Sequence, residues 1–136
     1  MTIFKQIIAG EIPCYKIWED EHFLCFLDIA PKSKGHALVI PKEEYEDITD
    51  IPDFLLKDLI VKVKKTAALL MTTLGADGCN IVQNTKPAAG QEVLHIHFHI
   101  IPRYKGDDVS WFKSTYSEKN FKDVLELIHK ESITNF

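Results

Sequence analysis

The stretch HIHFHII at residues 95–101 decides how this chain folds, because histidine and apolar residues alternate there without interruption. Strict alternation of polar and apolar side chains is typical of a half-buried β-strand, and isoleucine and phenylalanine favour strands. One side of the predicted strand is apolar and is expected in the core: Leu94, Ile96, Phe98 and Ile100. The other side carries imidazoles about 6.6 Å apart. It consists of His95, His97 and His99, followed by Ile101.

Three interpretations of this histidine row compete. A solvated strand face explains one or two histidines better than three. A metal site is the second interpretation, since two histidines at positions i and i+2 of a strand can converge on zinc. A catalytic row is the third, because neutral imidazole is a nucleophile and a proton carrier near neutral pH. A central nucleophile flanked by two orienting histidines suits phosphoryl or nucleotidyl transfer.

The segment NTKPAAGQEVL, residues 84–94, favours the catalytic interpretation. Pro87 and Gly90 indicate a loop, and its small residues let the backbone come close to a ligand. Asn84 and Gln91 offer amide donors, and exposed N–H groups in such a loop can bind an anion. The chain contains neither a Walker A motif nor a dinucleotide-binding glycine motif, so the loop alone is a weak signal. It becomes a strong one because it leads directly into the histidine row.

Composition and charge narrow the class of protein. A chain of 136 residues is long enough for one domain with a core, so a single domain over residues 1–136 is expected. The net charge of −4 argues against non-specific nucleic-acid binding, which needs a basic face. Neither an apolar run of about 18 residues nor a signal-peptide pattern occurs, so we expect no membrane association and a cytoplasmic location. The scattered cysteines, Cys14, Cys25 and Cys79, suit reduced thiols with a packing role.

The rest of the sequence alternates strand and helix patterns. It predicts a short helix over residues 3–9 and strands over 15–19, 23–27, 36–40 and 80–84, before the histidine strand. Pro52 opens a long helix that Gly75 ends. One stripe of this helix is apolar and should be buried: Leu55, Leu59, Val63, Ala67, Leu70 and Leu74. Ser117 is expected to cap a last helix, whose apolar face is Phe121, Val124, Leu125 and Ile128. Local hairpins with helices on one face of the sheet predict an α+β fold with an antiparallel sheet.

Residues 84–103, with AGQEVLHIHFHIIPR at their centre, resemble the signature of the histidine triad (HIT) family of nucleotide hydrolases and transferases. Two earlier stretches resemble the family in the expected order. IFKQIIAGEIPCYKIWEDE is similar to its amino-terminal helix and first strand, and FLCFLDIAPKSKGHALVIPK to its second and third strands. The resemblance covers nearly the whole chain. It implies one HIT-like domain with a five-stranded antiparallel sheet, one long helix and short terminal helices.

The resemblance also implies roles for individual residues. His97 matches the family's nucleophile, which forms a nucleotidyl-histidine. His95 and His99 match the flanking members that orient the site and contact phosphate, and His36 matches a fourth histidine. Asp28 matches a carboxylate that binds ribose hydroxyls. The other nucleotide-binding candidates are Ile29, Phe26, Asn84, Gln91, Glu92 and Val93.

Several positions depart from the family pattern. Many members bind structural zinc through an amino-terminal CxxC motif, but Thr2 and Lys5 occupy the matching positions and Glu44 replaces an expected histidine. We therefore expect no metal and no other cofactor. Glu92 stands where several members have a hydroxyl residue. Lys86 replaces a common glycine, and it either adds a cation near the phosphate or projects into solvent.

The expected function is hydrolysis of a purine nucleoside phosphoramidate that carries an AMP or GMP moiety. A dinucleoside polyphosphate hydrolase is the nearest alternative. A nucleotide-binding or partner-binding module with weak turnover and a metal-binding strand protein are alternatives from other classes. The resemblance further implies a homodimer through the helix at residues 52–74 and the fourth strand, where Leu56 and Ile60 add apolar surface.

Overall fold

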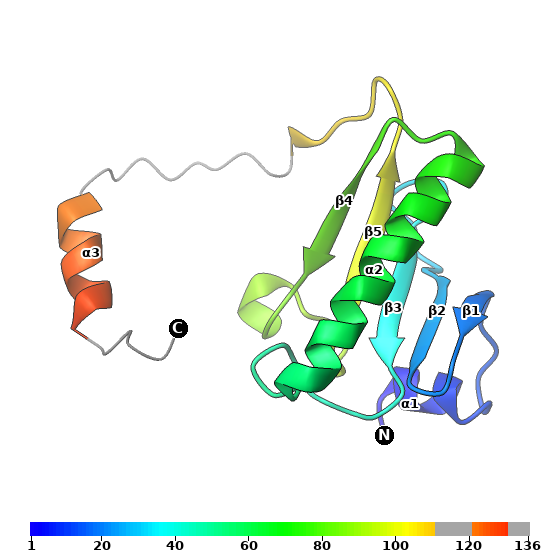
Figure 1. Ribbon diagram of the computed structural model, residues 1–136, viewed down its shortest axis with the longest axis horizontal. Coiled ribbons are helices and arrows are strands. Elements are labelled where there is room, and N and C mark those ends of the chain that lie inside the picture. Colours follow the sequence, from blue (N-terminus) through cyan, green and yellow to red (C-terminus); the bar gives the residue numbers. More distant parts are fainter. Residues whose placement is uncertain (111–120, 131–136) are drawn as a thin grey trace.

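The computed structural model describes residues 1–110 and 121–130, and its centre is a five-stranded sheet in the order β1-β2-β3-β5-β4 (Figure 1). All neighbouring strands in the sheet run antiparallel. The strands are β1 (Lys16–Glu19), β2 (Phe23–Leu27), β3 (Ala37–Pro41), β4 (Gly78–Gln83) and β5 (Phe98–Arg103). The predicted α+β fold with a five-stranded antiparallel sheet is therefore confirmed.

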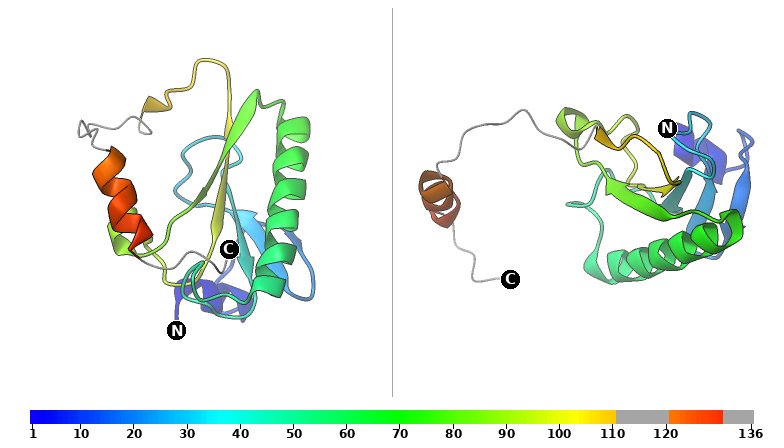
Figure 2. Two further views of the ribbon diagram at one scale, coloured as in Figure 1. Left: turned by 60° about the vertical axis from the view of Figure 1, so that its left-hand side comes forward. Right: turned by 90° about the horizontal axis from the view of Figure 1, so that it is seen from above.

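The long helix α2 (Asp53–Leu74) covers one face of the sheet and has the ends that the sequence predicts. Pro52 precedes it with extended backbone, and Gly75 ends it in the left-handed region at φ 65°, which glycine adopts without a steric penalty. The short helix α1 (Ile3–Ile8) lies on the other face of the sheet (Figure 2), so the prediction that the helices share one face is wrong. A 3₁₀ turn, η1 (Pro87–Ala89), lies in the loop between β4 and β5.

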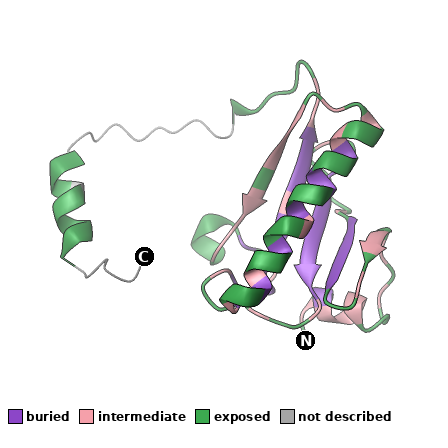
Figure 3. Cartoon of the chain, viewed as in Figure 1, coloured by how far each residue is buried: buried purple, intermediate pink, exposed green. Residues whose placement is uncertain are grey.

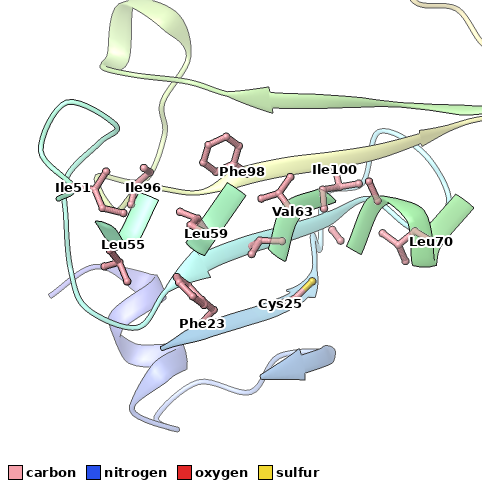
Figure 4. Close-up of a cluster of buried hydrophobic side chains, with 13 residues drawn as sticks. Phe23, Cys25, Ile51, Leu55, Leu59, Val63, Leu70, Ile96, Phe98 and Ile100 are labelled. Carbon is pink, nitrogen blue, oxygen red and sulfur yellow. The ribbon is translucent and has the colours of Figure 1, made fainter. Parts of the chain in front are cut away.

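The apolar stripe of α2 packs on the sheet and forms the larger core (Figure 4). Alternate strand residues face it, because successive side chains of a strand point to opposite faces. Its buried members include Phe23, Cys25, Val39, Leu55, Leu59, Val63, Ala67, Leu70, Ile96, Phe98 and Ile100. A smaller core on the α1 face contains Phe4, Leu24, Phe26, Leu38 and Ile40. The central strands are thus buried on both faces (Figure 3).

The strand that carries the histidine row is shorter than predicted. β5 begins one residue after His97, so only His99 of the three lies within the strand. Before β5 the backbone N–H of Ile96 donates to the carbonyl of Tyr45 at 2.7 Å, which ties this segment to the loop before α2. The prediction that Leu94 belongs to the core is wrong, because Leu94 is 43% exposed. The other residues of the apolar side are buried as predicted.

The last helix, α3 (Phe121–His129), is present, but the cap predicted at Ser117 lies outside the described residues. On its expected apolar face, Phe121, Leu125 and Ile128 are 51–66% exposed. The face predicted for this helix is therefore open in the single chain.

Two further findings concern membrane spans and thiols. Within the part of the chain that the structure describes, no helix has the length and apolar character needed to cross a membrane. The three cysteines are free, and complete burial raises the pKa of the Cys25 thiol to about 12. Cys25 therefore acts as a small apolar residue of the core.

Leu59 gives a direct test of this packing, because its side chain is fully buried between α2 and the sheet. Leu59→Ala should lower the free energy of unfolding by roughly 2–5 kcal/mol through lost burial and the cavity left behind. Lys57→Ala, on the exposed side of the same helix, should change it by less than about 0.5 kcal/mol. Urea unfolding measures both, and equal effects would contradict the packing of α2.

Candidate active site

A cavity of about 560 Å³ opens on the α1 face of the sheet. Its wall comes from α1, the loop after β2, strands β3 to β5 and the loop that contains η1. The sequence-predicted residues on this wall are Asp28, Ile29, His36, Asn84, Glu92, Val93, His97 and His99. The structure therefore brings together residues from four separate segments. Three predicted residues, His95, Phe26 and Gln91, are buried and lie outside the wall.

His97 is held as an imidazole with one nitrogen free to react. Its Nδ1 lies 2.8 Å from the backbone carbonyl of His95, and a carbonyl only accepts, so Nδ1 carries the proton. Nε2 therefore keeps the lone pair. Phe4 packs edge-on against the ring, with 5.0 Å between centroids. Burial lowers the pKa of His97 below the usual value, so the neutral, nucleophilic form dominates at neutral pH.

His95 supports His97 from outside the cavity. Its ring is fully buried, and its Nε2 donates to the carbonyl of Pro41 at 2.8 Å. This bond ties the segment before β5 to the end of β3 and fixes the carbonyl that holds His97. Nδ1 of His95 then carries a lone pair and has no hydrogen-bond partner among the described residues. The geometry thus gives His95 an orienting position, without a place on the wall for a phosphate contact.

A chain of hydrogen bonds sets the tautomers of His36 and His99. The backbone N–H of Lys32 donates to Nδ1 of His36 at 3.0 Å, so neutral His36 carries its proton on Nε2. That proton faces Nδ1 of His99 at 3.0 Å, which leaves the proton of His99 on Nε2. Burial, with smaller contributions from His97 and His36, lowers the pKa of His99 to about 4. His99 is therefore a neutral donor in the cavity.

Asp28, His36 and His99 lie close enough to share a metal ion, with ligand atoms within 4.8 Å of one another. The tautomer of His36 argues against that use, because its Nε2 carries a proton where a metal needs a lone pair. One oxygen of Asp28 accepts from the N–H of Ala30 at 2.8 Å, and the other lies 3.5 Å from Nε2 of His36. Asp28, His36 and His99 therefore suit a hydrogen-bond network better than a metal site. That the site holds no metal stays a prediction.

Gln91 organises the loop instead of facing the cavity. Its Nε2 donates to the carbonyls of Glu46 at 2.6 Å and Val93 at 3.0 Å. Its Oε1 accepts from the backbone N–H of Lys86 at 2.7 Å. The amide is fully engaged with main-chain groups, so it leaves no donor for a phosphate.

Some wall residues were not singled out from the sequence. Phe4 of α1 contacts His97, and its only sequence signal is that it is the aromatic residue of the amino-terminal helix. Lys32 places a cation on a wall that also carries Asp28 and Glu92. Nothing local separates Lys32 from Lys34 in the same loop, so its position required the fold.

The fold, together with a neutral His97 that the carbonyl of His95 holds at the wall of a cavity, is the basis for assigning the class of protein. The HIT domain model matches residues 9–106, and the chain belongs to the HIT family. An uncharacterized HIT-like protein of Methanocaldococcus jannaschii is 57% identical over 107 residues, 79% of this chain and 82% of that protein. The adenosine 5'-monophosphoramidase of Schizosaccharomyces pombe is 41% identical over 129 residues, 93% and 94% of the two chains. The crystal structure of a Bacillus subtilis HIT family member superposes with a TM-score of 0.82 at 38% identity, covering 98% of both chains.

The pKa of His99 can be tested by NMR titration of its ring. The midpoint should lie near 4, because burial favours the neutral ring, whereas an unfolded histidine titrates near 6.5. His99 therefore contributes stability that is complete above about pH 6.5 and is lost as the pH falls toward 4. A His99→Asn variant should show a shallower loss of unfolding free energy over that range. A ring midpoint at or above about 6.5 would contradict the buried, neutral donor.

Proposed function

We propose that this chain is a nucleotide hydrolase that acts on purine nucleoside phosphoramidates through a nucleotidyl-histidine intermediate on His97. The observation that carries the proposal is the Nε2 lone pair of a buried, neutral His97 on the wall of a cavity of about 560 Å³. A cavity of this size falls within the range of small-molecule sites. The name of the Schizosaccharomyces pombe relative supports the same chemistry.

The reaction has two displacements at phosphorus. Nε2 of His97 attacks the α-phosphorus, the bond from phosphorus to the leaving nitrogen breaks, and its electron pair goes to the nitrogen, which takes a proton from solvent and departs as the amine. Solvent regains a proton from the water that attacks in the second displacement. Nδ1–H of His97 keeps its bond to the carbonyl of His95 while the ring gains positive charge. Water then attacks phosphorus, the bond to Nε2 breaks, and a nucleoside monophosphate leaves with neutral His97 restored. Nε2–H of His99 donates to a phosphoryl oxygen, where negative charge develops.

Asp28 and Ile29 serve the nucleoside in this proposal. The Asp28 side chain is 20% exposed at the wall, and a carboxylate has enough lone pairs to accept from both ribose hydroxyls besides the N–H of Ala30. Ile29 is 83% exposed beside it and offers apolar surface to a base. Asn84, Glu92 and Val93 lie on the loop side of the same cavity.

A dinucleoside polyphosphate hydrolase is the second candidate within the same mechanism. Its leaving group would be the second nucleoside with its remaining phosphates, and Glu92 places a further negative charge on the wall, which opposes such a group. Parallel assays of an adenosine phosphoramidate and a diadenosine polyphosphate separate the two. Nucleotide binding without turnover of either would support a binding module instead.

A cytoplasmic location belongs to the same proposal, because free thiols suit a reducing compartment.

His97→Asn tests the nucleophile. Asparagine keeps a polar side chain but cannot form the phosphorus–nitrogen bond, so kcat should fall by roughly 10³-fold or more while AMP still binds. His95→Asn and His99→Asn should cost less, because they remove orientation and charge stabilisation only. His22→Asn is the control, since His22 lies exposed in the turn before β2.

Mass spectrometry of quenched reactions should find the nucleotidyl group on residue 97. A His97→Asn protein with near wild-type turnover would refute the mechanism.

We also propose that the chain forms a homodimer through α2 and β4. β4 is an edge strand, and its Ile81 is paired with Ile100 of β5. Paired residues point to the same face of a sheet, so the side chain of Ile81 lies on the α2 face, where Ile81 is 47% exposed. Ile60 and Leu69 of α2 are 44% and 45% exposed. Leu56, which the sequence suggested as interface, is partly buried against the core and so offers less apolar surface than Ile60.

Sedimentation measures the dimer directly. The wild-type mass at micromolar concentration should equal two chains, and Ile81→Lys should reduce it to one, because a charge on an edge strand opposes pairing. Tyr15→Lys, an equally polar change at an exposed residue before β1, should leave the dimer intact. A wild-type mass near one chain would refute the proposal.

A further inference from the structure

Lys86 adopts a backbone conformation that glycine normally occupies. Its φ is 77° and its ψ is 155°, and it is the only residue other than glycine with positive φ in residues 1–110 and 121–130. A side chain with a Cβ is strained in this region, which is essentially restricted to glycine. Such strain persists only when the surrounding structure holds the residue in place. The loop between β4 and β5 must therefore contain contacts that offset it.

The ammonium group of Lys86 supplies one such contact, with Asp47. Nζ of Lys86 lies 2.8 Å from Oδ2 of Asp47, whose side chain is fully buried. Oδ1 of Asp47 accepts from the N–H and the hydroxyl of Thr49 at 2.8 and 2.6 Å. The ammonium of Lys86, with the bonds from Thr49, holds the pKa of Asp47 at about 2, so this carboxylate is charged at neutral pH. A buried carboxylate is costly unless it is paired, so loss of Lys86 would leave Oδ2 uncompensated.

The pair holds the loop that forms one side of the cavity. Lys86 does not line the cavity, but Asn84, Glu92 and Val93 of the same loop do. The backbone N–H of Lys86 also donates to Gln91, whose amide in turn donates to the carbonyl of Glu46. The loop is thus fixed to residues 46 and 47 at two adjacent points, one ionic and one through an amide.

We propose that Lys86 and Asp47 form a positioning pair that holds the cavity loop, residues 84–93, in its ligand-binding conformation and thereby sets nucleotide affinity without contact with the nucleotide. The choice of nucleotide as ligand rests on the proposed function. In this pair the ammonium group of Lys86 binds Asp47, so it neither adds a cation near the phosphate nor projects unpaired into solvent. It also explains how a lysine is accommodated at a backbone position that suits glycine.

Hydrogen exchange of the loop tests the pair without any ligand. The N–H groups of Ala89, Gly90 and Gln91 donate to main-chain carbonyls within the loop, so their exchange rates report its opening. Lys86→Met keeps the strain and removes the ion pair, so these amides should exchange roughly tenfold faster. Lys86→Arg keeps the charge and should retain most of the protection. Lys57→Met, on the exposed side of α2, is the matched control and should leave the loop unchanged.

Lys86→Gly gives the decisive comparison. Glycine adopts the φ of 77° freely, so Lys86→Gly should protect the loop better than Lys86→Met, although glycine usually loosens a loop. A loop that exchanges faster in Lys86→Gly than in Lys86→Met would show that no strain is relieved and would overturn the proposal. Unchanged exchange in Lys86→Met would overturn it as well.

Binding of AMP then separates positioning from direct phosphate contact. Asp47→Asn tests the pair from its other side, and it should weaken AMP binding roughly tenfold and raise KM more than it lowers kcat. If Lys86 contacted phosphate directly, release from Asp47 would strengthen AMP binding, which would overturn the proposal. Failure of the wild type to bind AMP would refute the nucleotide function, and with it the proposed effect on affinity, while hydrogen exchange would still decide whether the pair holds the loop.

Discussion

The hydrogen bond from Nδ1 of His97 to the backbone carbonyl of His95 is the contact on which the proposed chemistry of this site depends. It places the ring proton on Nδ1 and leaves the lone pair on Nε2. The carbonyl is itself fixed, because the ring of His95 donates to the carbonyl of Pro41 at the end of β3. The N–H of Lys32 makes the corresponding choice for His36 and, through it, for His99. Main-chain groups thus decide the tautomers of these four histidines, and they come from the end of β3 and from the segments that precede β3 and β5.

Burial gives these imidazoles their second property. α2 covers the face of the sheet opposite the cavity, so the residues that alternate with His97 and His99 provide the apolar core, and the histidines can lie on the other face. Burial favours the neutral imidazole and lowers the pKa of His36, His95, His97 and His99, and Phe4 covers the ring of His97. The burial that keeps His97 neutral also strengthens the hydrogen bonds that orient it.

The alternation in HIHFHII was enough to predict two faces and the buried side chains Ile96, Phe98 and Ile100, because a strand has a period of two. The same pattern could not show that the strand begins only at Phe98, since the preceding segment is held by the bond from Ile96 to the distant Tyr45. His36 and Asp28 were proposed from family resemblance, and only the antiparallel pairing of β2, β3 and β5 brings them beside His99. The pair of Lys86 and Asp47 had no sequence signal, because neither a positive φ at a lysine nor a contact across 39 positions is encoded locally.

The most direct measurement of the central claim is the tautomer of each ring, obtained from long-range ¹⁵N–¹H correlation of the histidine side chains at neutral pH. His97 should carry its proton on Nδ1, whereas His95 and His36 should carry theirs on Nε2, as their carbonyl and N–H partners require. A neutral His97 protonated on Nε2 would contradict the arrangement, because the nitrogen available to the cavity would then be a donor and could not attack phosphorus.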